Sequence, residues 1–308
     1  RYRWSLLVSA SVVFAWSPAI AQTEPGPSGP QVVRDKVTVT ATRIEEATDE
    51  VPATVTVLTD QDIENELVTD IKDLVRFEPG ISVQTQPARF GAALGTTGRA
   101  GNSGFNIRGL EGNRVLIQVD GVRVPYGYSF GPQANGRGNY VDLDLLQAVE
   151  FVRGPSSALY GSDGLAGSVS FITRDPDSLV QDGEQFGVRA RTAYASADRS
   201  WANSLIGATE YGDWSGLLAY TRRDSKAPDN QGEVGGEGET RTRPNPQDTE
   251  SNSWLAKVVY APGDMNRFRL TFDGTDSETT ADILSGRATS FFTGQTTLSL
   301  TSRDLTER

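Results

Sequence analysis

The sequence of 308 residues contains neither cysteine nor histidine. Without cysteine it forms no disulfide and no thiolate metal site. Without histidine it lacks the usual general base and the commonest metal ligand. These absences exclude, within this chain, a Ser-His-Asp hydrolase, a Cys-His protease and a His-ligated zinc enzyme. A secreted enzyme that uses a carboxylate pair such as Asp142 and Asp144 stays open, although carboxylates two positions apart in a short polar segment are usually solvated.

Long apolar runs and an excess of positive charge are also missing. No stretch reaches 18 consecutive apolar residues, so the sequence contains no ordinary transmembrane helix. Strands of a transmembrane barrel alternate apolar and polar residues, and the mean hydropathy of -0.39 is compatible with them. The 29 Lys and Arg against 40 Asp and Glu give a net charge of -11, which argues against nucleic-acid binding. The length allows two ordinary domains.

The first 21 residues have the pattern of a secretory signal peptide. Arg1 and Arg3 precede the apolar stretch 4–16, and the small-residue triplet 19–21 follows. We therefore expect cleavage after Ala21 and export of the mature chain. Because the sequence starts without Met and stops within a patterned stretch at 301–308, we expect both ends to be cut and further strands to be missing.

Residues 37–175 have the pattern of a mixed α+β domain. Thr59 followed by Asp62 predicts a helix start, with Ile63 and Leu67 at helical spacing, and a second short helix is expected after Thr69. Asp120-Gly121 predicts a hairpin turn. Strands are expected at 53–58, 81–83, 105–108, 115–119, 149–153 and 168–173, and loops at 84–104 and 125–140.

From residue 186 onward the residues alternate with the period of strands. Phe186 and Tyr194 share one face of the first strand, whereas Arg189 and Arg191 share the other. Short turns alternate with long polar excursions such as 223–250, which is typical of an outer-membrane barrel, and a soluble β-sandwich is the alternative. The stretch 186–308 has room for five or six strands of roughly 10 residues each. Aromatic residues that suit interfacial girdles lie near the strand ends: Tyr194, Trp201, Tyr211, Trp214, Tyr220, Trp254 and Tyr260.

Four segments in a fixed order carry a family resemblance. They are Asn106–Gly109, Val115–Arg123, Val149–Gly161 and Gly164–Thr173. Behind a signal peptide, this order resembles that of TonB-dependent outer-membrane receptors over essentially the whole chain. The segment 106–117 is most similar to the heme/hemoglobin receptor branch.

The resemblance implies an α+β plug domain followed by the opening antiparallel strands of a transmembrane β-barrel. The expected divisions are a signal peptide at 1–21, a flexible leader with a TonB box at 22–43, a plug at 44–178 and the first part of a barrel at 179–308. About 13 residues separate Gln22 from Asp35. This spacing leaves no room for an extra signalling domain, so a transporter is expected.

The β-branched run after the leader corresponds to the TonB box. An extended segment with free backbone donors and acceptors can add as a strand to a partner's sheet, here TonB. An internal edge strand of the plug is the plain alternative. The residues are Lys36, Val37, Thr38, Val39, Thr40, Ala41 and Thr42.

Nine plug residues lie inside the matching segments: Arg108, Gly109, Asp120, Gly121, Glu150, Arg153, Gly154, Tyr160 and Gly161. The resemblance implies that the arginines near strand glycines, Arg108 and Arg153, face acidic residues on the barrel wall. Solvated surface charges are the alternative. The glycines are expected to serve tight turns rather than ligand contacts.

The resemblance further implies active import of an iron-bearing ligand without bond chemistry, so no enzyme and no cofactor are expected. Heme or a ferric chelate would be cargo, with TonB, outer-membrane lipid and a host heme protein as partners. The lack of histidine, a common heme ligand in such receptors, raises a ferric siderophore as an alternative. A passive porin or adhesin is the alternative of another class. The ligand-facing candidates are Arg89, Phe90, Arg99, Tyr126, Tyr128, Phe130, Arg137 and Tyr140.

Overall fold

The computed structural model describes most of the chain from residue 53 onward and two short strands before it. The described residues are 37–38, 46–47, 53–86, 102–130, 133–135, 141–156, 164–181, 183–263, 266–287, 289–290, 294–295 and 299–307. The expected signal peptide at 1–21 and most of the leader lie outside these ranges. None of the helices within them is both long and apolar enough to cross a membrane. Residues 36–308 form one compact unit.

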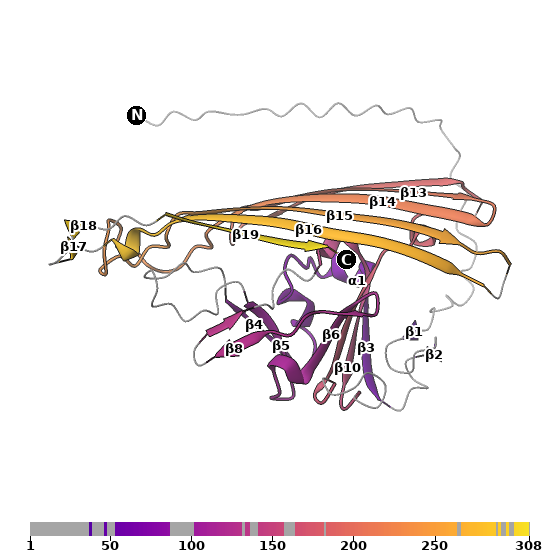
Figure 1. Ribbon diagram of the computed structural model, residues 1–308, viewed down its shortest axis with the longest axis horizontal. Coiled ribbons are helices and arrows are strands. Elements are labelled where there is room, and N and C mark those ends of the chain that lie inside the picture. The colour runs from indigo at the N-terminus through magenta and orange to yellow at the C-terminus, as the bar shows by residue number, and fades with distance from the viewer. Residues whose placement is uncertain are drawn as a thin grey trace, which may run out of the picture. The chain divides into compact units, whose positions relative to one another are not determined.

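A five-stranded sheet organises the α+β domain, residues 53–178 (Figure 1). Its order is β3 (Thr54–Thr59), β10 (Leu146–Arg153), β11 (Gly167–Thr173), β6 (Val115–Val119) and β7 (Val122–Arg123). Only β11 and β6 pair in parallel. β-Branched and aromatic residues supply most of these strands, as strand propensity requires. The core includes Phe105, Phe151 and Phe171, each no more than 1% exposed.

The helices of this domain are shorter than the sequence pattern predicts. Helix α1 (Asp60–Asn65) begins with the expected capping box between Thr59 and Asp62. It ends before Leu67, which has a φ of 52° and is 74% exposed, so the expected helical partner of Ile63 lies outside the core. The second helix is reduced to the 3₁₀ turn η1 (Asp73–Val75).

Two hairpins and three 3₁₀ turns complete the domain. Strands β4 (Ile81–Gln86) and β5 (Asn102–Ile107) pair antiparallel, as do β8 (Tyr128–Phe130) and β9 (Gln133–Asn135). The expected loop at 84–104 is therefore strand at both of its ends. The 3₁₀ turns are η2 (Gly112–Arg114), η3 (Leu143–Leu145) and η4 (Pro176–Ser178).

A six-stranded antiparallel sheet follows, with the long strands side by side in Figure 1. Its order is β12 (Phe186–Ala195), β13 (Ser200–Tyr211), β14 (Trp214–Lys226), β15 (Gln247–Tyr260), β16 (Phe268–Asp282) and β19 (Ser299–Glu307). The prediction of five or six strands is confirmed. Between β16 and β19 lie η5 (Leu284–Gly286) and the two-residue strands β17 (Thr289–Ser290) and β18 (Gly294–Gln295).

The two faces of this sheet differ in burial, which alternates along each strand. In β13, Ala202, Ile206 and Ala208 are buried, whereas Trp201 and Leu205, at alternate positions, are half exposed. We call the buried side the inner face and the other the outer face. Outer-face aromatics form two groups along the strands, with aliphatic residues such as Leu218 between them. The first group lies near one end of the strands and contains Phe186, Tyr211, Trp214, Tyr260 and Phe268. The second contains Tyr194 and Trp201 near the opposite ends of β12 and β13, and Tyr220 and Trp254 midway along β14 and β15, because these two strands extend further than their sequence pattern indicates.

The first pair of short strands includes two residues of the expected TonB box. Val37 and Thr38 form β1 (Val37–Thr38) and pair with β2 (Glu46–Ala47). The expectation that the backbone of the whole run is unpaired therefore needs correction at these two residues, because β2 takes up part of their hydrogen-bonding capacity. Lys36 and Val39 to Thr42 lie outside the described residues.

Candidate functional site

An apolar seam joins the inner face of the six-stranded sheet to the α+β domain. Leu145 of η3 and Val180, just after η4, cluster with Ile206, Leu217 and Leu255 of three neighbouring strands. All five residues are buried. Because side chains alternate along a strand, this seam fixes which other residues of β13, β14 and β15 point toward the α+β domain.

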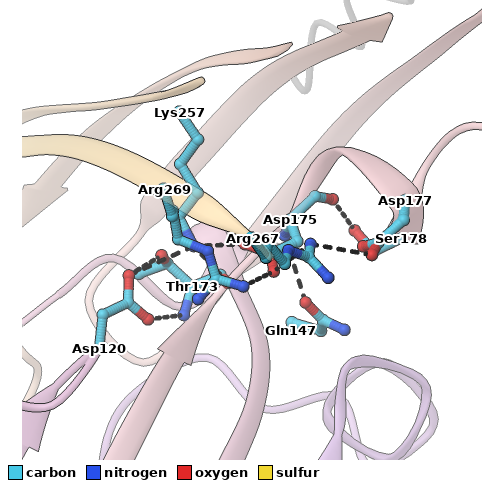
Figure 2. A network of polar contacts seen from close by, with 9 residues as sticks. All are labelled: Asp120, Gln147, Thr173, Asp175, Asp177, Ser178, Lys257, Arg267 and Arg269. Atoms are coloured by element: carbon cyan, nitrogen blue, oxygen red, sulfur yellow. Dashed lines mark hydrogen bonds and ion pairs between the residues drawn. The ribbon is translucent and has the colours of Figure 1, made fainter. Parts of the chain in front are cut away.

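Lys257 of β15 is the most deeply buried charge at this interface. Its side chain is 0% exposed. The ammonium Nζ donates to the backbone carbonyl of Thr173 and to Oδ1 of Asp175, each at 2.9 Å, and lies 3.3 Å from Oδ2 of Asp120 (Figure 2). We call these four residues the Lys257 cluster. A buried ammonium is tolerated because two carboxylates and a carbonyl replace its water shell.

Asp120 lies in the hairpin turn that the Asp120-Gly121 pair predicts, and this turn fixes its position. Asp120 and Gly121 have φ values of 47° and 81° and connect β6 to β7 through adjacent pairing of Val119 with Val122. Positive φ at both central residues defines a type I′ hairpin turn, and the turn prediction is confirmed. The Asp120 carboxylate accepts hydrogen bonds from the backbone N–H of Thr173 at 2.9 Å and from its hydroxyl.

Asp175 gathers further cations from the sheet. Arg269 of β16 forms an ion pair with Oδ2 of Asp175, and Arg267 lies 3.3 Å from the same oxygen. Arg267 also reaches Asp177 at 3.2 Å (Figure 2). The backbone N–H of Asp175 donates to Oε1 of Gln147 at 3.2 Å. Asp175 therefore anchors the segment where β11 leaves the α+β domain to begin the second sheet.

A second group of ion pairs lies along β12. Arg189 pairs with Glu64 and lies 3.8 Å from Asp60, while Arg191 pairs with Asp144. Within the α+β domain, Arg174 reaches Asp60 at 2.7 Å. The period-2 pattern had placed Arg189 and Arg191 together on the face opposite Phe186, and the structure agrees.

Arg223 of β14 has only long contacts with the α+β domain among the described residues. Nη2 of Arg223 lies 3.7 Å from Oδ2 of Asp142, and Nη1 donates to the carbonyl of Thr69 at 3.4 Å. Burial raises the pKa of Asp142, and the nearby Arg223 only partly opposes that shift. Asp142 and Asp144 are thus not a solvated pair, since their side chains are 7% and 4% exposed and each faces a sheet arginine.

The expectation that Arg108 and Arg153 face acidic residues of the second sheet needs correction. Among the described residues, Arg153 contacts no carboxylate of the second sheet. It pairs with Glu78 and donates to Oγ1 of Thr56 at 2.9 Å, both within the α+β domain. Arg108 is exposed with a φ of 52°, and Glu150 is 1% exposed inside the central strand β10. In the ion pairs described above between the two parts, the α+β domain supplies the carboxylates and the sheet supplies the cations.

The remaining candidates are only partly described. Gly109 and Gly154 have φ values of 87° and 132°, as turn glycines should. Tyr126 is 54% exposed, and its hydroxyl accepts from Arg123 at 3.3 Å. Tyr128 and Phe130 lie in β8, with side chains outside the described set. Tyr160, Gly161, Arg89, Phe90, Arg99, Arg137 and Tyr140 also lie outside the described residues.

The sequence reasoning missed the residues of the Lys257 cluster other than Asp120. A signal was present, because Lys257 shares one strand face with Leu255 and Val259, and a charge on an otherwise apolar face needs a partner. No group of acidic residues in the described part of the chain is arranged to hold a metal ion. The ion pairs described above form a charged, largely buried contact between the α+β domain and the six-stranded sheet.

Comparisons with known proteins identify the α+β domain. Residues 47–168 match the TonB-dependent Receptor Plug Domain family. Transferrin-binding protein A of Haemophilus influenzae is 34% identical over 54% of this chain and 18% of that protein. The hemoglobin and hemoglobin-haptoglobin-binding protein of Haemophilus ducreyi is 32% identical over 70% of this chain and 22% of that protein. The chain thus spans about a fifth of the length of these curated relatives.

A solved structure extends the likeness to the second sheet. A double mutant of the Serratia marcescens hemophore receptor HasR, in complex with its hemophore HasA and heme, matches with a TM-score of 0.58. The match has 18% identity and covers 83% of this chain and 38% of that one. This level of identity supports the fold alone. The chain therefore carries the plug domain of a TonB-dependent receptor, followed by antiparallel strands that match part of such a receptor's barrel.

Proposed function

We propose that this chain is part of an outer-membrane receptor that imports an iron-bearing ligand, heme or hemoglobin-derived heme, with energy from TonB. The observation that carries the proposal is the charged contact between plug and sheet. Six cations of the sheet and its connections meet plug carboxylates: Arg189, Arg191, Arg223, Lys257, Arg267 and Arg269. Water can replace the partners of such groups after displacement, so a plug held this way can leave its seat and return.

The outer face supports a place in the outer membrane. Its two groups of aromatic residues flank aliphatic ones, which is the distribution expected at the two interfaces of a lipid bilayer. Trp214 and Tyr260 stack with ring centroids 4.5 Å apart, and Tyr194 lies 4.9 Å from Trp201. In this proposal residues 44–178 are the plug and residues 179–308 the first part of the barrel, with the long connections 227–246 and 283–298 outside the cell.

The relatives favour an iron-related ligand taken from a protein. The curated relatives are named for binding transferrin, lactoferrin or hemoglobin. A host heme protein is therefore the proposed partner, and the ligand-facing candidates are those of the two plug loops, such as Tyr126. A ferric siderophore is the second candidate, because Tyr and Arg side chains also suit an anionic chelate. A passive porin or an adhesin would need no plug of this family.

Growth of iron-starved cells tests the proposal. The full-length receptor is expressed with and without residues 36–42, and growth is measured on hemoglobin, on heme and on a ferric siderophore. We expect growth on hemoglobin or heme that is lost with the deletion, since TonB can then no longer pair with the leader.

A deletion of the same length in the preceding stretch, residues 24–30, serves as the control and should leave growth intact. Receptor levels in the outer membrane are measured for all variants. Equal growth of the 36–42 deletion would reject TonB coupling through this segment. Growth on the siderophore alone would replace heme with the second candidate.

A further inference from the structure

The inner face of the sheet changes character along its strands. One cross-strand row contains Ile206, Ala219 and Leu255 and belongs to the apolar seam. The next inner row toward the long loops contains Ser204, Thr221, Ser253 and Thr275 instead. The change from aliphatic to hydroxyl side chains occurs on all of β13, β14 and β15 at the same row.

Hydroxyl side chains continue in the rows beyond. We call six of them the hydroxyl wall: Thr221, Thr249, Ser251, Ser253, Thr275 and Ser277. Their register places them on one face of three adjacent strands. Within the described inner positions of this zone on β14 to β16, Arg223 is the one charged residue, and it lies opposite Ser251.

The hydrogen bonds of the wall are incomplete. The hydroxyls of Ser253 and Thr275 lie 3.0 Å apart. Thr221, by contrast, is 0% exposed, and its hydroxyl oxygen has no hydrogen-bond partner among the described residues. A buried hydroxyl without a partner costs free energy, so this position is suited to a polar group that is present only part of the time.

Arg223 is held less closely than Lys257. Its contacts with the plug are 3.7 Å to Asp142 and 3.4 Å to the Thr69 carbonyl, whereas the ammonium of Lys257 has two contacts at 2.9 Å. The side chain of Arg223 also keeps 24% of its surface exposed. A competing anion can therefore replace Asp142 at Arg223 more readily than any anion can enter the Lys257 cluster.

We propose that the hydroxyl wall and Arg223 form the surface along which an anionic, oxygen-rich ligand passes between plug and barrel, with Asp142 occupying Arg223 until the ligand's anionic group replaces it. This inference rests on the proposed import function and specifies its cargo class and its path. Neutral hydroxyls bind such a ligand at many weak points, which allows entry without trapping. A guanidinium supplies the one strong, directional contact with an anionic oxygen group.

A thiol placed in the wall measures this path directly. The 308 residues contain no cysteine, so Ser251→Cys introduces a new reactive site opposite Arg223. In cells with the full-length receptor, the thiol is treated with an anionic (sulfonate) or a cationic (trimethylammonium) methanethiosulfonate. The receptor without the introduced cysteine gives the background.

The ratio of anionic to cationic modification rates is the readout. We expect Arg223→Gln to lower this ratio at the S251C thiol by about tenfold, the lower end of the effect of local potential on encounter rates. Arg223→Lys, which keeps the charge, should retain the ratio. A matched thiol at Asn203→Cys, on the outer face of β13, should be insensitive to either substitution. If Arg223→Gln leaves the ratio of anionic to cationic modification rates at the S251C thiol unchanged, the inference is overturned.

Two ligands then identify the source of the anionic group. Hemin and ferric citrate are each tested for slowing the modification of the S251C thiol. Slowing by hemin points to the heme carboxylates, and slowing by ferric citrate points to a ferric chelate. Slowing by neither contradicts the assigned path.

The same assay in cells without TonB separates this inference from the proposed function. Loss of TonB should lower both modification rates and leave their ratio unchanged. If TonB has no effect on either rate while the ratio still depends on Arg223, energised import fails and the anionic preference of the wall stands.

Discussion

At the scale of single residues, burial distinguishes the ion pairs that hold the plug against the sheet from the exposed ion pairs that contribute little to stability. Lys257 has no exposed side-chain surface, whereas Lys226, one strand away, pairs with Asp248 at 2.7 Å with both side chains more than half exposed. Exposed ion pairs contribute little to stability because water and salt screen them. Removing one partner of a buried pair leaves the other charges without compensation.

Lys257→Met should therefore destabilise the seated plug by about 3–5 kcal/mol, because the Asp120 and Asp175 carboxylates lose their shared cation. Thermal unfolding and limited proteolysis of the full-length receptor in detergent measure the effect. Lys226→Met makes the same change at an exposed pair and should alter stability by no more than about 1 kcal/mol. Equal effects of the two substitutions would refute the structural role of the Lys257 cluster.

Local rules predicted some residues, and long-range contacts decided the others. The Asp120-Gly121 turn follows from backbone preferences of two adjacent residues, so the sequence was sufficient. Arg153 pairs with Glu78, which lies 75 positions earlier in the chain. The sequence contains many carboxylates, and only the fold determines which of them lies beside Arg153. The same reason explains why the partners of Lys257 were missed.

At the scale of elements, alternation located the long strands and underestimated their length. The pattern assigns all of 223–250 to a long polar connection, whereas β14 reaches Lys226 and β15 starts at Gln247. The added residues are mostly polar, such as Arg223, Asp224 and Glu250. Polar side chains weaken the apolar signal, but continuous cross-strand pairing keeps their backbones extended. Helix α1 shows the opposite error, because Leu67 fits the helical period and yet takes a left-handed φ.

The plug sheet places a strict demand on Gly167 at the start of β11. Its φ is 148°, and a Cβ built there would lie 2.1 Å from the carbonyl oxygen of Val152 on β10. Gly167→Ala should therefore destabilise the plug by about 2 kcal/mol or more, since backbone pairing between β10 and β11 must shift. The thermal midpoint of the full-length receptor is the measurement.

Gly104→Ala is the matched control for this prediction. No atom lies within 4 Å of a Cβ built at Gly104, and its φ is not in the left-handed region. It should change the midpoint little or raise it slightly. A stable G167A receptor would show that the β10–β11 contact can relax without cost.

At the scale of the whole molecule, the two parts differ in what supports them. The plug has its own core of aliphatic and aromatic residues, including Phe105, Phe151 and Phe171. The buried apolar cluster of the six-stranded sheet includes Leu145 and Val180 from outside its strands, while Leu218 and Leu270 on its outer face are 70% and 73% exposed. A sheet with such a face needs lipid or another partner to cover it.

Residues 44–178 should therefore be soluble and monomeric when produced alone, and residues 179–308 should aggregate. Size-exclusion chromatography and circular dichroism of the two pieces provide the check. Monomeric, folded material from 179–308 would contradict the membrane placement and favour the soluble β-sandwich. Aggregation of 44–178 would mean that the plug depends on the sheet for its fold.

The sequence predicted the family and the architecture because the motif segments are local and ordered. It did not identify the ligand, since ligand contacts depend on how loops distant in sequence meet. Arg89, Arg137 and Tyr140, for example, were chosen by residue type in two separate loops. Residue type alone does not place them around one ligand.

The position of β3 at the edge of the plug sheet has a kinetic consequence. Its only neighbour in that sheet is β10, and the paired residues Thr59 and Ala148 lie about 90 positions apart. Closing so long a loop is slow, because chain entropy is lost before the contacts that compensate for it form. Under the export proposed above, the central sheet therefore assembles only after most of the plug sequence has left the export machinery. In the proposed export, the late pairing of β3 with β10 keeps the plug unfolded while it crosses the membrane and delays its folding until it has crossed.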